Sequence, residues 1–290
     1  MKNDPFVTHR GLLFTVAYEM LGSAADAEDV VQEAWLRWAD TDHLEVRDPR
    51  SFLIRIVTRQ ALNRLRTLSR RREDYAGDWL PEPVLTSPDV GKDLELVENI
   101  SFAMLTVLET LGPTERAVFV LREVFQVPFD EIAAAIGKAP AAVRQIAHRA
   151  REHVAARRPR MRVDHTETQA AVEKFLAAMR TGDVRGLLDV LAPDVVMVTD
   201  SGGLVSAASK PIEGAEKLAK FFMGLITGAP ATYAGTTVWI NGTPGARIDV
   251  AGEVAAALSL TVEDGRITRI YAIRNPHKLA RLDAEAALAR

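Results

Sequence analysis

The chain has 290 residues, of which 48% are hydrophobic and 26% charged, and its formal net charge is −3; this length and balance predict a soluble protein of two or three folded domains. It contains no cysteine, which excludes disulfides, thiol redox chemistry and cysteine-based zinc sites within this chain. No apolar run approaches the roughly 20 residues of a transmembrane helix, and the start of the chain lacks the basic and apolar segments of a signal peptide, so a cytoplasmic protein without a membrane partner is expected.

The first predicted domain, residues 1–72, is helical throughout. Ser23 with Asp26 three residues later resembles a capping box. Apolar residues then recur at the spacing of one helix face, which favours core packing for both tryptophans; they are Ala27, Val30, Val31, Ala34, Trp35 and Trp38. The opposite face is acidic and would repel DNA, so a basic protein surface is favoured as its partner over a carboxylate metal site. It carries Asp26, Glu28, Asp29, Gln32 and Glu33.

A second helix of this domain is predicted to begin at Pro49, with Asp48 as its N-cap. Residues 50–72 contain eight arginines and no acid. The polar face of this helix could therefore follow a phosphate backbone, while Gln60 and Asn63 offer hydrogen bonds to base edges. A solvated helix face is the alternative.

Residues 73–97 are predicted to be a linker, because prolines at the density of residues 79–83, WLPEP, disfavour a helix. The segment is also acidic: residues 73–98 hold eight acids against Lys92. Trp79 is unusual in such a setting, because an aromatic side chain in a polar linker normally covers a surface.

Residues 98–158 are predicted to be helical again. A short helix closed by Gly137 and a longer basic helix have the outline of a helix-turn-helix, and residues 138–162 carry eight Lys or Arg against one acid. Two basic blocks on helical patterns favour nucleic-acid binding, whereas a plain helical hairpin is the alternative. The outward side chains of the second helix could reach bases and phosphates; they are Arg144, Gln145, His148, Arg149 and Arg151. A basic connector, residues 157–163, follows.

Residues 165–290 change character, because helical patterns are followed by strand-like segments, with a hairpin signal at Asp264-Gly265. The predicted fold class is thus multidomain, with two all-α domains followed by an α+β domain. An enzyme is an alternative, since carboxylates and phenols in a cavity can move protons beside a carbonyl; the candidates are Asp200, Asp249, Tyr233 and Tyr271. Surface or hairpin positions are the favoured explanation of these residues, and we expect neither catalysis nor a cofactor or metal.

Four motifs, in order, resemble the extracytoplasmic-function (group IV) sigma factors of the sigma-70 family. Residues 26–35, DAEDVVQEAW, resemble the region 2.2 helix that docks on core RNA polymerase, and residues 49–68 are similar to regions 2.3 and 2.4, which melt and read the −10 element. Residues 111–119, LGPTERAVF, resemble the start of region 4, and residues 129–151 its helix-turn-helix, which reads the −35 element. The resemblance implies promoter-specific transcription initiation, with core polymerase and promoter DNA as partners; an ordinary repressor or activator is the alternative.

The resemblance also implies residue roles. Core polymerase binding falls to Asp26, Glu28, Asp29, Gln32 and Glu33. Binding of the −10 element falls to Arg55, Arg59, Gln60, Asn63, Arg64 and Arg66. Binding of the −35 element falls to Arg144, Gln145, His148, Arg149 and Arg151. One departure is that residues 139–142, APAA, stand where many relatives carry Ser, so the recognition helix has a weak N-cap that costs about 1 kcal/mol.

The C-terminal domain looks like the SnoaL-like, NTF2-like cone of SigJ-type sigma factors, a domain taken to regulate the sigma part in cis. The supporting segments are WLPEP at residues 79–83, DSGG at 200–203 with Lys210-Pro211, and NPHKL at 275–279. We expect the WLPEP segment to pack against the cone and the NPHKL tail, and the cone to accept a small apolar ligand. The residues implied in this interdomain regulation are Trp79, Pro81, Asp200, Asn275, Pro276 and Lys278.

Overall fold

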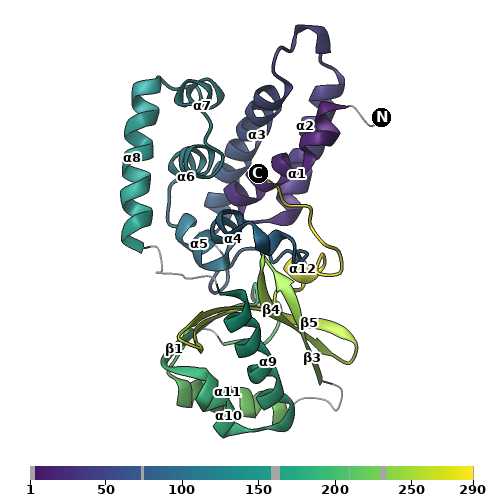
Figure 1. The fold of residues 1–290 in the computed structure, drawn as a ribbon, viewed down its shortest axis with the longest axis vertical. Coiled ribbons are helices and arrows are strands. Elements are labelled where there is room, and N and C mark those ends of the chain that lie inside the picture. Colours follow the sequence, from purple (N-terminus) through teal and green to yellow (C-terminus); the bar gives the residue numbers. More distant parts are fainter. Residues whose placement is uncertain (1–3, 73–74, 158–163, 209, 229–232, 290) are drawn as a thin grey trace. The chain divides into compact units, whose positions relative to one another are not determined.

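The computed structural model describes residues 4–72, 75–157, 164–208, 210–228 and 233–289, and its chain forms two compact units. The helical unit comprises Met1–Asp74, Ala103–Pro159 and Ala287–Arg290, and the cone unit comprises Tyr75–Phe102 and Arg160–Ala286. Figure 1 follows the chain through both. Two parts of the predicted connections, residues 73–74 and 158–163, lie outside the described residues.

The first part of the helical unit consists of α1 (Pro5–Leu21), α2 (Ala24–Ala39), the 3₁₀ turn η1 (His43–Glu45) and α3 (Pro49–Arg72). Both predicted caps are confirmed. The Ser23 hydroxyl accepts the backbone N–H of Asp26 at 3.2 Å, and the Asp48 carboxylate accepts the backbone N–H groups of Arg50 and Ser51. These bonds satisfy amides that the first helical turn leaves without partners.

The two tryptophans of α2 differ in burial. Trp38 is 2% exposed and donates its indole N–H to Asp4, whereas Trp35 is 46% exposed. The core position expected for Trp35 is therefore wrong. Successive helix residues turn by about 100°, so Trp35 lies roughly 60° around the helix from Trp38 and falls at the edge of the apolar stripe.

The second part of the helical unit contains α5 (Phe102–Leu108), α6 (Pro113–Phe119), the π-helical turn η3 (Val120–Val124), α7 (Phe129–Ile136) and α8 (Pro140–Arg157). Helix α7 ends at Gly137, whose φ of 69° lies in the left-handed region that favours glycine. The inner face predicted for α8 is confirmed, and it buries Val143, Ile146, Ala147, Ala150 and Val154. Helices α7 and α8 pack on one another as a helix-turn-helix.

The cone unit combines helices with one sheet. Its helices are α9 (His165–Thr181), α10 (Val184–Val190), α11 (Ala215–Gly228) and α12 (Pro276–Leu279). Its strands are β1 (Leu191–Asp200), β2 (Ile212–Glu213), β3 (Tyr233–Ile240), β4 (Thr243–Val250), β5 (Glu253–Glu263) and β6 (Arg266–Ile273). The sheet order is β2-β1-β6-β5-β4-β3, with β1 parallel to β6 and the other pairs antiparallel. Helices α9, α10 and α11 pack against the sheet and bury an apolar core with it (Figure 1).

Tight turns set the register of the four consecutive strands β3 to β6. Asp264 and Gly265, the predicted hairpin, have φ values of 51° and 72°, which is the positive-φ pair that a two-residue hairpin turn requires. Two further turns, Asn241-Gly242 and Ala251-Gly252, have positive φ at both residues as well. This sheet and the helices of the same unit confirm the α+β character predicted from the sequence.

The predicted linker is an integral part of the cone unit. The backbone N–H of Thr86 donates to Trp239 at 3.0 Å, and the backbone N–H of Asn241 donates to Val84 at 2.9 Å. The segment continues through the 3₁₀ turn η2 (Val90–Lys92) and α4 (Leu94–Ile100). Because α4 belongs to the cone unit, the helical unit resumes at Ala103 and not at residue 98.

Candidate nucleic-acid interface and linker dock

The outward face of α8 holds all five residues predicted to bind the −35 element, and each of them is exposed. Two have acidic neighbours: Arg151 lies 3.7 Å from Glu123, and His148 lies 3.9 Å from Glu152. Arg144 and Arg149 form no ion pair with the described residues. Pro140 occupies the first position of α8, where its fixed φ suits a helix start. The helix thus presents an accessible basic surface of the kind that fits a DNA groove.

The residues of α3 predicted to bind the −10 element divide into three groups. Arg55, Asn63 and Arg66 are exposed. Gln60 is buried, and neither atom of its amide has a partner among the described residues. The third group consists of Arg59 and Arg64, which are engaged within the helical unit.

Arg64 joins the two predicted sets of contact residues. Its guanidinium lies 2.6 Å from the Asp26 carboxylate and 2.7 Å from that of Asp29, both on α2. Partial burial alone would lower the pKa of Arg64, but the two carboxylates raise it overall. Glu28 is likewise paired, with Arg10 at 2.7 Å. Asp29 is exposed despite its pair with Arg64, and Gln32, Glu33 and Trp35 are exposed beside it.

Arg59 makes a direct contact between the two parts of the helical unit. It donates to the carbonyl oxygens of Ala134 at 2.9 Å and Ala135 at 3.1 Å, in the last turn of α7. The last carbonyls of a helix lack intrahelical partners and carry partial negative charge, so a guanidinium is a favourable cap for them.

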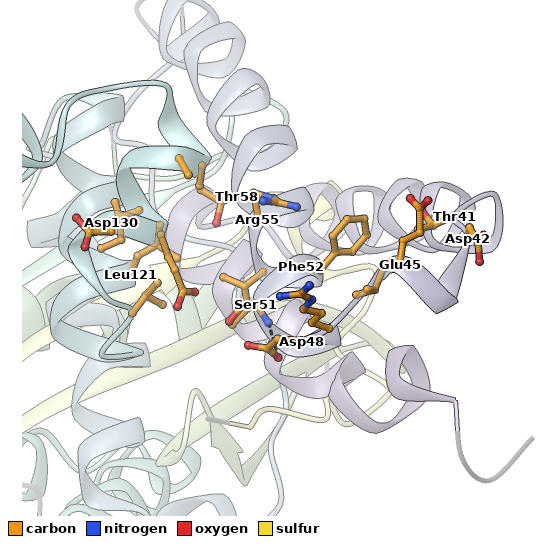
Figure 2. A pocket seen from close by; sticks show the side chains of 18 residues that line it. Thr41, Asp42, Glu45, Asp48, Ser51, Phe52, Arg55, Thr58, Leu121 and Asp130 are labelled. Carbon is orange, nitrogen blue, oxygen red and sulfur yellow. Dashed lines mark hydrogen bonds between the residues drawn. The ribbon is translucent and has the colours of Figure 1, made fainter.

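A cavity of about 630 Å³ lies beside this contact, between the start of α3 and α7 (Figure 2). Phe52 and Arg55 lie on the α3 side, where the Arg55 guanidinium stands 5.2 Å from the Phe52 ring centre, and Asp130 lies on the α7 side. The acids that line the cavity are Asp42, Glu45, Asp48, Asp130 and Glu131. The segment that precedes α3 therefore faces region 4 in this arrangement.

Contacts with the cone unit hold residues 75–86 of the linker in place, and we call this set of contacts the linker dock. Asp200, at the end of β1, is its centre. It is fully buried and accepts the Tyr75 hydroxyl at 2.7 Å and the backbone N–H of Leu80 at 2.8 Å. The Lys278 ammonium lies 2.6 Å from the same carboxylate, and the backbone N–H of Gly202 donates to it at 3.1 Å. One carboxylate thus ties the linker to the NPHKL tail.

The rest of the dock surrounds Lys278. Its ammonium stands 4.1 Å from the ring centre of Trp79 and donates to the Leu80 carbonyl, while the Asn275 amide donates to the Tyr75 hydroxyl at 2.8 Å. Burial, with the hydrogen bond to Asp200, raises the pKa of Tyr75 and keeps its hydroxyl a donor. The expected contact between the WLPEP segment, the cone and the NPHKL tail is confirmed.

The two prolines predicted for this site have different positions: Pro81 is buried, whereas Pro276 is exposed at the start of α12. Sequence reasoning missed Tyr75 and Asn241. The Asn241 side chain accepts the Val84 N–H at 3.1 Å and donates to the Ile100 carbonyl at 2.8 Å, so it binds the linker at two places. The signal for Tyr75 is the same as for Trp79, an aromatic residue in a polar linker.

The four residues of the enzyme alternative do not share a site. Tyr233 lines a cavity in the cone, but Asp200 faces the linker and Tyr271 lies beside Phe102. Asp249 pairs with Arg247 at 3.0 Å. The carboxylates are therefore not placed for proton transfer in that cavity.

Within the described part of the chain, no helix is long and apolar enough to cross a bilayer. No group of three or more His, Asp or Glu side chains comes together there in a way that could hold a metal ion.

A basic helix-turn-helix and an arginine-rich helix behind an acidic one define the class: a sigma-70-type initiation factor. The family model for Sigma-70 region 2 matches residues 6–71, and that for Sigma-70, region 4 matches residues 101–154. The chain belongs to the extracytoplasmic-function (ECF) sigma factors. It is 39% identical over 294 residues to the ECF RNA polymerase sigma factor SigJ of Mycobacterium tuberculosis, covering 96% of this chain and 93% of SigJ.

Two further comparisons agree. The probable ECF RNA polymerase sigma factor SigI of Mycobacterium tuberculosis is 32% identical over 280 residues, covering 96% of this chain and 94% of SigI. The crystal structure of Mycobacterium tuberculosis SigJ matches with a TM-score of 0.74 at 35% identity, covering 96% of this chain and 98% of that one. The family predicted from the sequence is confirmed, and so is the predicted order of sigma regions 2 and 4 followed by an α+β domain. The chain is a sigma factor that directs transcription initiation, and not an enzyme.

Proposed function

We propose that this sigma factor, acting in the cytoplasm, docks on core RNA polymerase through α2 and reads the −10 and −35 elements with α3 and α8. We further propose that its cone unit modulates promoter use in cis. The docked linker is the observation that supports modulation in cis, because residues 75–102, which join region 2 to region 4, belong to the cone unit.

The exposed face of α2 supports the polymerase proposal. Asp29, Gln32 and Glu33 lie beside the exposed Trp35. Aromatic residues are enriched at protein interfaces, and an acidic surround selects a basic partner. Because Arg64 pairs with Asp29, docking through α2 would also affect the helix that we assign to the −10 element.

Promoter binding requires regions 2 and 4 to separate. The −10 and −35 elements lie 25 base pairs apart by their names, which is about 85 Å along B-DNA. In the free chain both regions belong to one compact unit, and Arg59 is bonded to the carbonyls of α7. Arg59 must leave those carbonyls before it can contact DNA.

The docked linker limits how the separation happens. A free segment of residues 75–102 could extend to about 90 Å and would accommodate many spacings. The dock instead buries Asp200 and uses backbone hydrogen bonds at Leu80, Val84 and Thr86, so undocking would resemble local unfolding. We therefore infer that the cone unit keeps the linker docked and acts as a spacer that restricts the distance between the two promoter-reading helices.

Weakening the dock should broaden the range of promoters that the factor accepts. We expect Lys278→Met and Trp79→Ala to raise transcript yield about fivefold, relative to wild type, from promoters whose spacer is changed by one or two base pairs; this corresponds to roughly 1 kcal/mol. Lys278→Met keeps the aliphatic stem but removes the ion pair to Asp200 and the cation that stands over Trp79. The measurement is reconstituted transcription with core polymerase on a promoter library of varied spacer length.

Lys217→Met is the matched control, because Lys217 is exposed on α11. Hydrogen exchange on residues 75–86 should first establish that the dock has loosened in the test variants. A spacer profile identical to wild type, despite faster exchange in that segment, would count against the spacer proposal and leave the sigma activity itself intact.

The recognition helix makes a separate prediction. Arg149→Met should weaken holoenzyme binding to promoters and reduce the salt dependence of that binding by about one counterion, because Arg149 is exposed and has no competing ion pair among the described residues. The check is a titration of holoenzyme on promoter DNA across salt concentrations. Arg180→Met, an exposed position on α9, is the control, and an unchanged slope for Arg149→Met would remove this residue from the DNA interface.

A further inference from the structure

The cone holds a cavity of about 340 Å³ between its sheet and helices α9 and α11. That volume is at the lower end of the roughly 300–1,000 Å³ of small-molecule sites. Its wall is largely apolar and includes Phe175, Met179, Met197, Phe221, Phe222 and Leu258. Adaptable methionines and aromatic rings suit a compact hydrophobic ligand.

Three polar side chains interrupt this apolar wall. The Tyr233 hydroxyl and the Thr199 hydroxyl are buried, and neither has a hydrogen-bond partner among the described residues. Buried polar atoms nearly always have a hydrogen-bond partner, so two buried hydroxyls without one in the same cavity require an explanation. The third is the half-buried Arg274, whose guanidinium donates to the Ser206 carbonyl.

The charge in the cavity is one-sided. Arg274 is the charged residue among those that line it, and no described carboxylate does so. Burial lowers the pKa of Arg274, yet a guanidinium remains protonated at any physiological pH. An uncompensated cation in apolar surroundings favours an anionic partner, and the planar fork of arginine matches a carboxylate in particular.

We propose that the cone cavity is a binding site for a small apolar carboxylate, with the carboxylate on Arg274 and hydrogen bonds from the hydroxyls of Tyr233 and Thr199. The ring or chain of the ligand would occupy the space beside Phe175 and Phe222. One guanidinium and two neutral donors match a single negative charge, whereas a phosphate dianion would keep an unbalanced charge in the cavity.

The site adjoins the linker dock through two pairs of neighbouring residues. Thr199 and Asp200 are consecutive in β1, where alternate side chains point to opposite faces, and Thr199 lines the cavity while Asp200 holds the linker. In the same way, Arg274 lines the cavity while Asn275 contacts Tyr75 of the linker. Both residues donate their backbone N–H to the Asp200 carbonyl, at 2.7 and 3.0 Å. A bound ligand would therefore change the stability of the linker dock. This consequence rests on the function proposed above, whereas the binding itself does not.

The test uses the full chain with two probes, 2-naphthoate and octanoate, and with 2-naphthylmethanol as the uncharged match. We expect 2-naphthoate to bind with a Kd on the order of 10–100 µM and the alcohol at least about tenfold more weakly, measured by calorimetry. Labelled methionine methyl groups locate the site by NMR. The signals of Met179 and Met197 should shift, whereas those of Met20 and Met104, in the helical unit, should not.

Variants separate the contributions. Tyr233→Phe should bind 2-naphthoate about fivefold more weakly while its Tm is unchanged or higher, because the lost hydroxyl has no protein partner to abandon. Arg274→Met should lower the affinity for 2-naphthoate at least about tenfold and change the affinity for the alcohol little. The proposal is overturned if neither carboxylate binds up to about 5 mM, if Arg274→Met binds 2-naphthoate as wild type does, or if Met20 shifts as much as Met197. These readouts do not involve transcription, so failure of the spacer proposal would not affect them.

Discussion

Replacing Asp200 by alanine is expected to lower the free energy of unfolding of the cone unit by about 3–5 kcal/mol, the range for breaking a buried ion pair from one side. The carboxylate accepts hydrogen bonds from Tyr75, Leu80 and Gly202 and neutralises the mostly buried Lys278. Without it the ammonium would lose this ion pair, in a site largely closed to water. Chemical denaturation of the full chain, with hydrogen exchange on residues 75–86, measures the loss.

The pair of charges can be tested against its neutral counterpart. Asp200→Asn with Lys278→Met removes both charges and should recover about half of the loss caused by Asp200→Ala, because neither member of the ion pair is then left buried without the other. Lys217→Met serves again as the exposed control. If Asp200→Ala costs less than about 1 kcal/mol, which is the value of an ordinary surface pair, Asp200 is not the centre of the dock.

Local patterns in the sequence were sufficient to predict the helices and their caps. The inner face of α8, the caps at Ser23 and Asp48, and the turn at Asp264-Gly265 each depend on residues a few positions apart. These features follow from helix periodicity and turn chemistry alone. The contact of WLPEP with the cone could be predicted because an exposed tryptophan in a polar segment is costly.

Long-range partners could not be predicted in this way. Arg59 caps helix α7, which lies 75 residues further along the chain, and Arg64 pairs with acids of a preceding helix. No spacing rule connects such residues, so the sequence showed their charge and not their partners. Asn241 was missed for a related reason: an Asn-Gly turn explains the residue locally and hides its bonds to Val84 and Ile100.

Arg116 is a second residue whose substitution should have a large effect. It is 1% exposed, its Nε donates to the Glu19 carbonyl at 3.0 Å, and its guanidinium pairs with Glu109. Glu19 lies in the last turn of α1, where carbonyls lack intrahelical partners. Arg116 of region 4 thus caps a helix of region 2, as Arg59 of region 2 caps a helix of region 4. These two reciprocal contacts hold the free helical unit closed.

The two contacts should differ in strength, because Arg59 is exposed whereas Arg116 is buried. We expect Arg116→Met, which keeps most of the side-chain volume, to lower the free energy of unfolding of the helical unit by about 3 kcal/mol. This is the lower end of the range for a broken buried pair, since Glu109 is 17% exposed and its carboxylate can turn towards water. Arg59→Met should cost less than about 1 kcal/mol.

Hydrogen exchange distinguishes loss of the contact from general unfolding. Arg116→Met should speed exchange at the end of α1 and in α6, and adding Glu109→Gln should recover part of the stability because the charge that pairs with Arg116 is then removed as well. Exchange in β5 and β6 of the cone unit serves as the internal control. If Arg116→Met opens the helical unit while its helices stay folded, the energy that keeps regions 2 and 4 together before promoter binding resides mainly in this one arginine; if stability does not change, apolar packing between the helices holds the unit closed and the arginines only orient it.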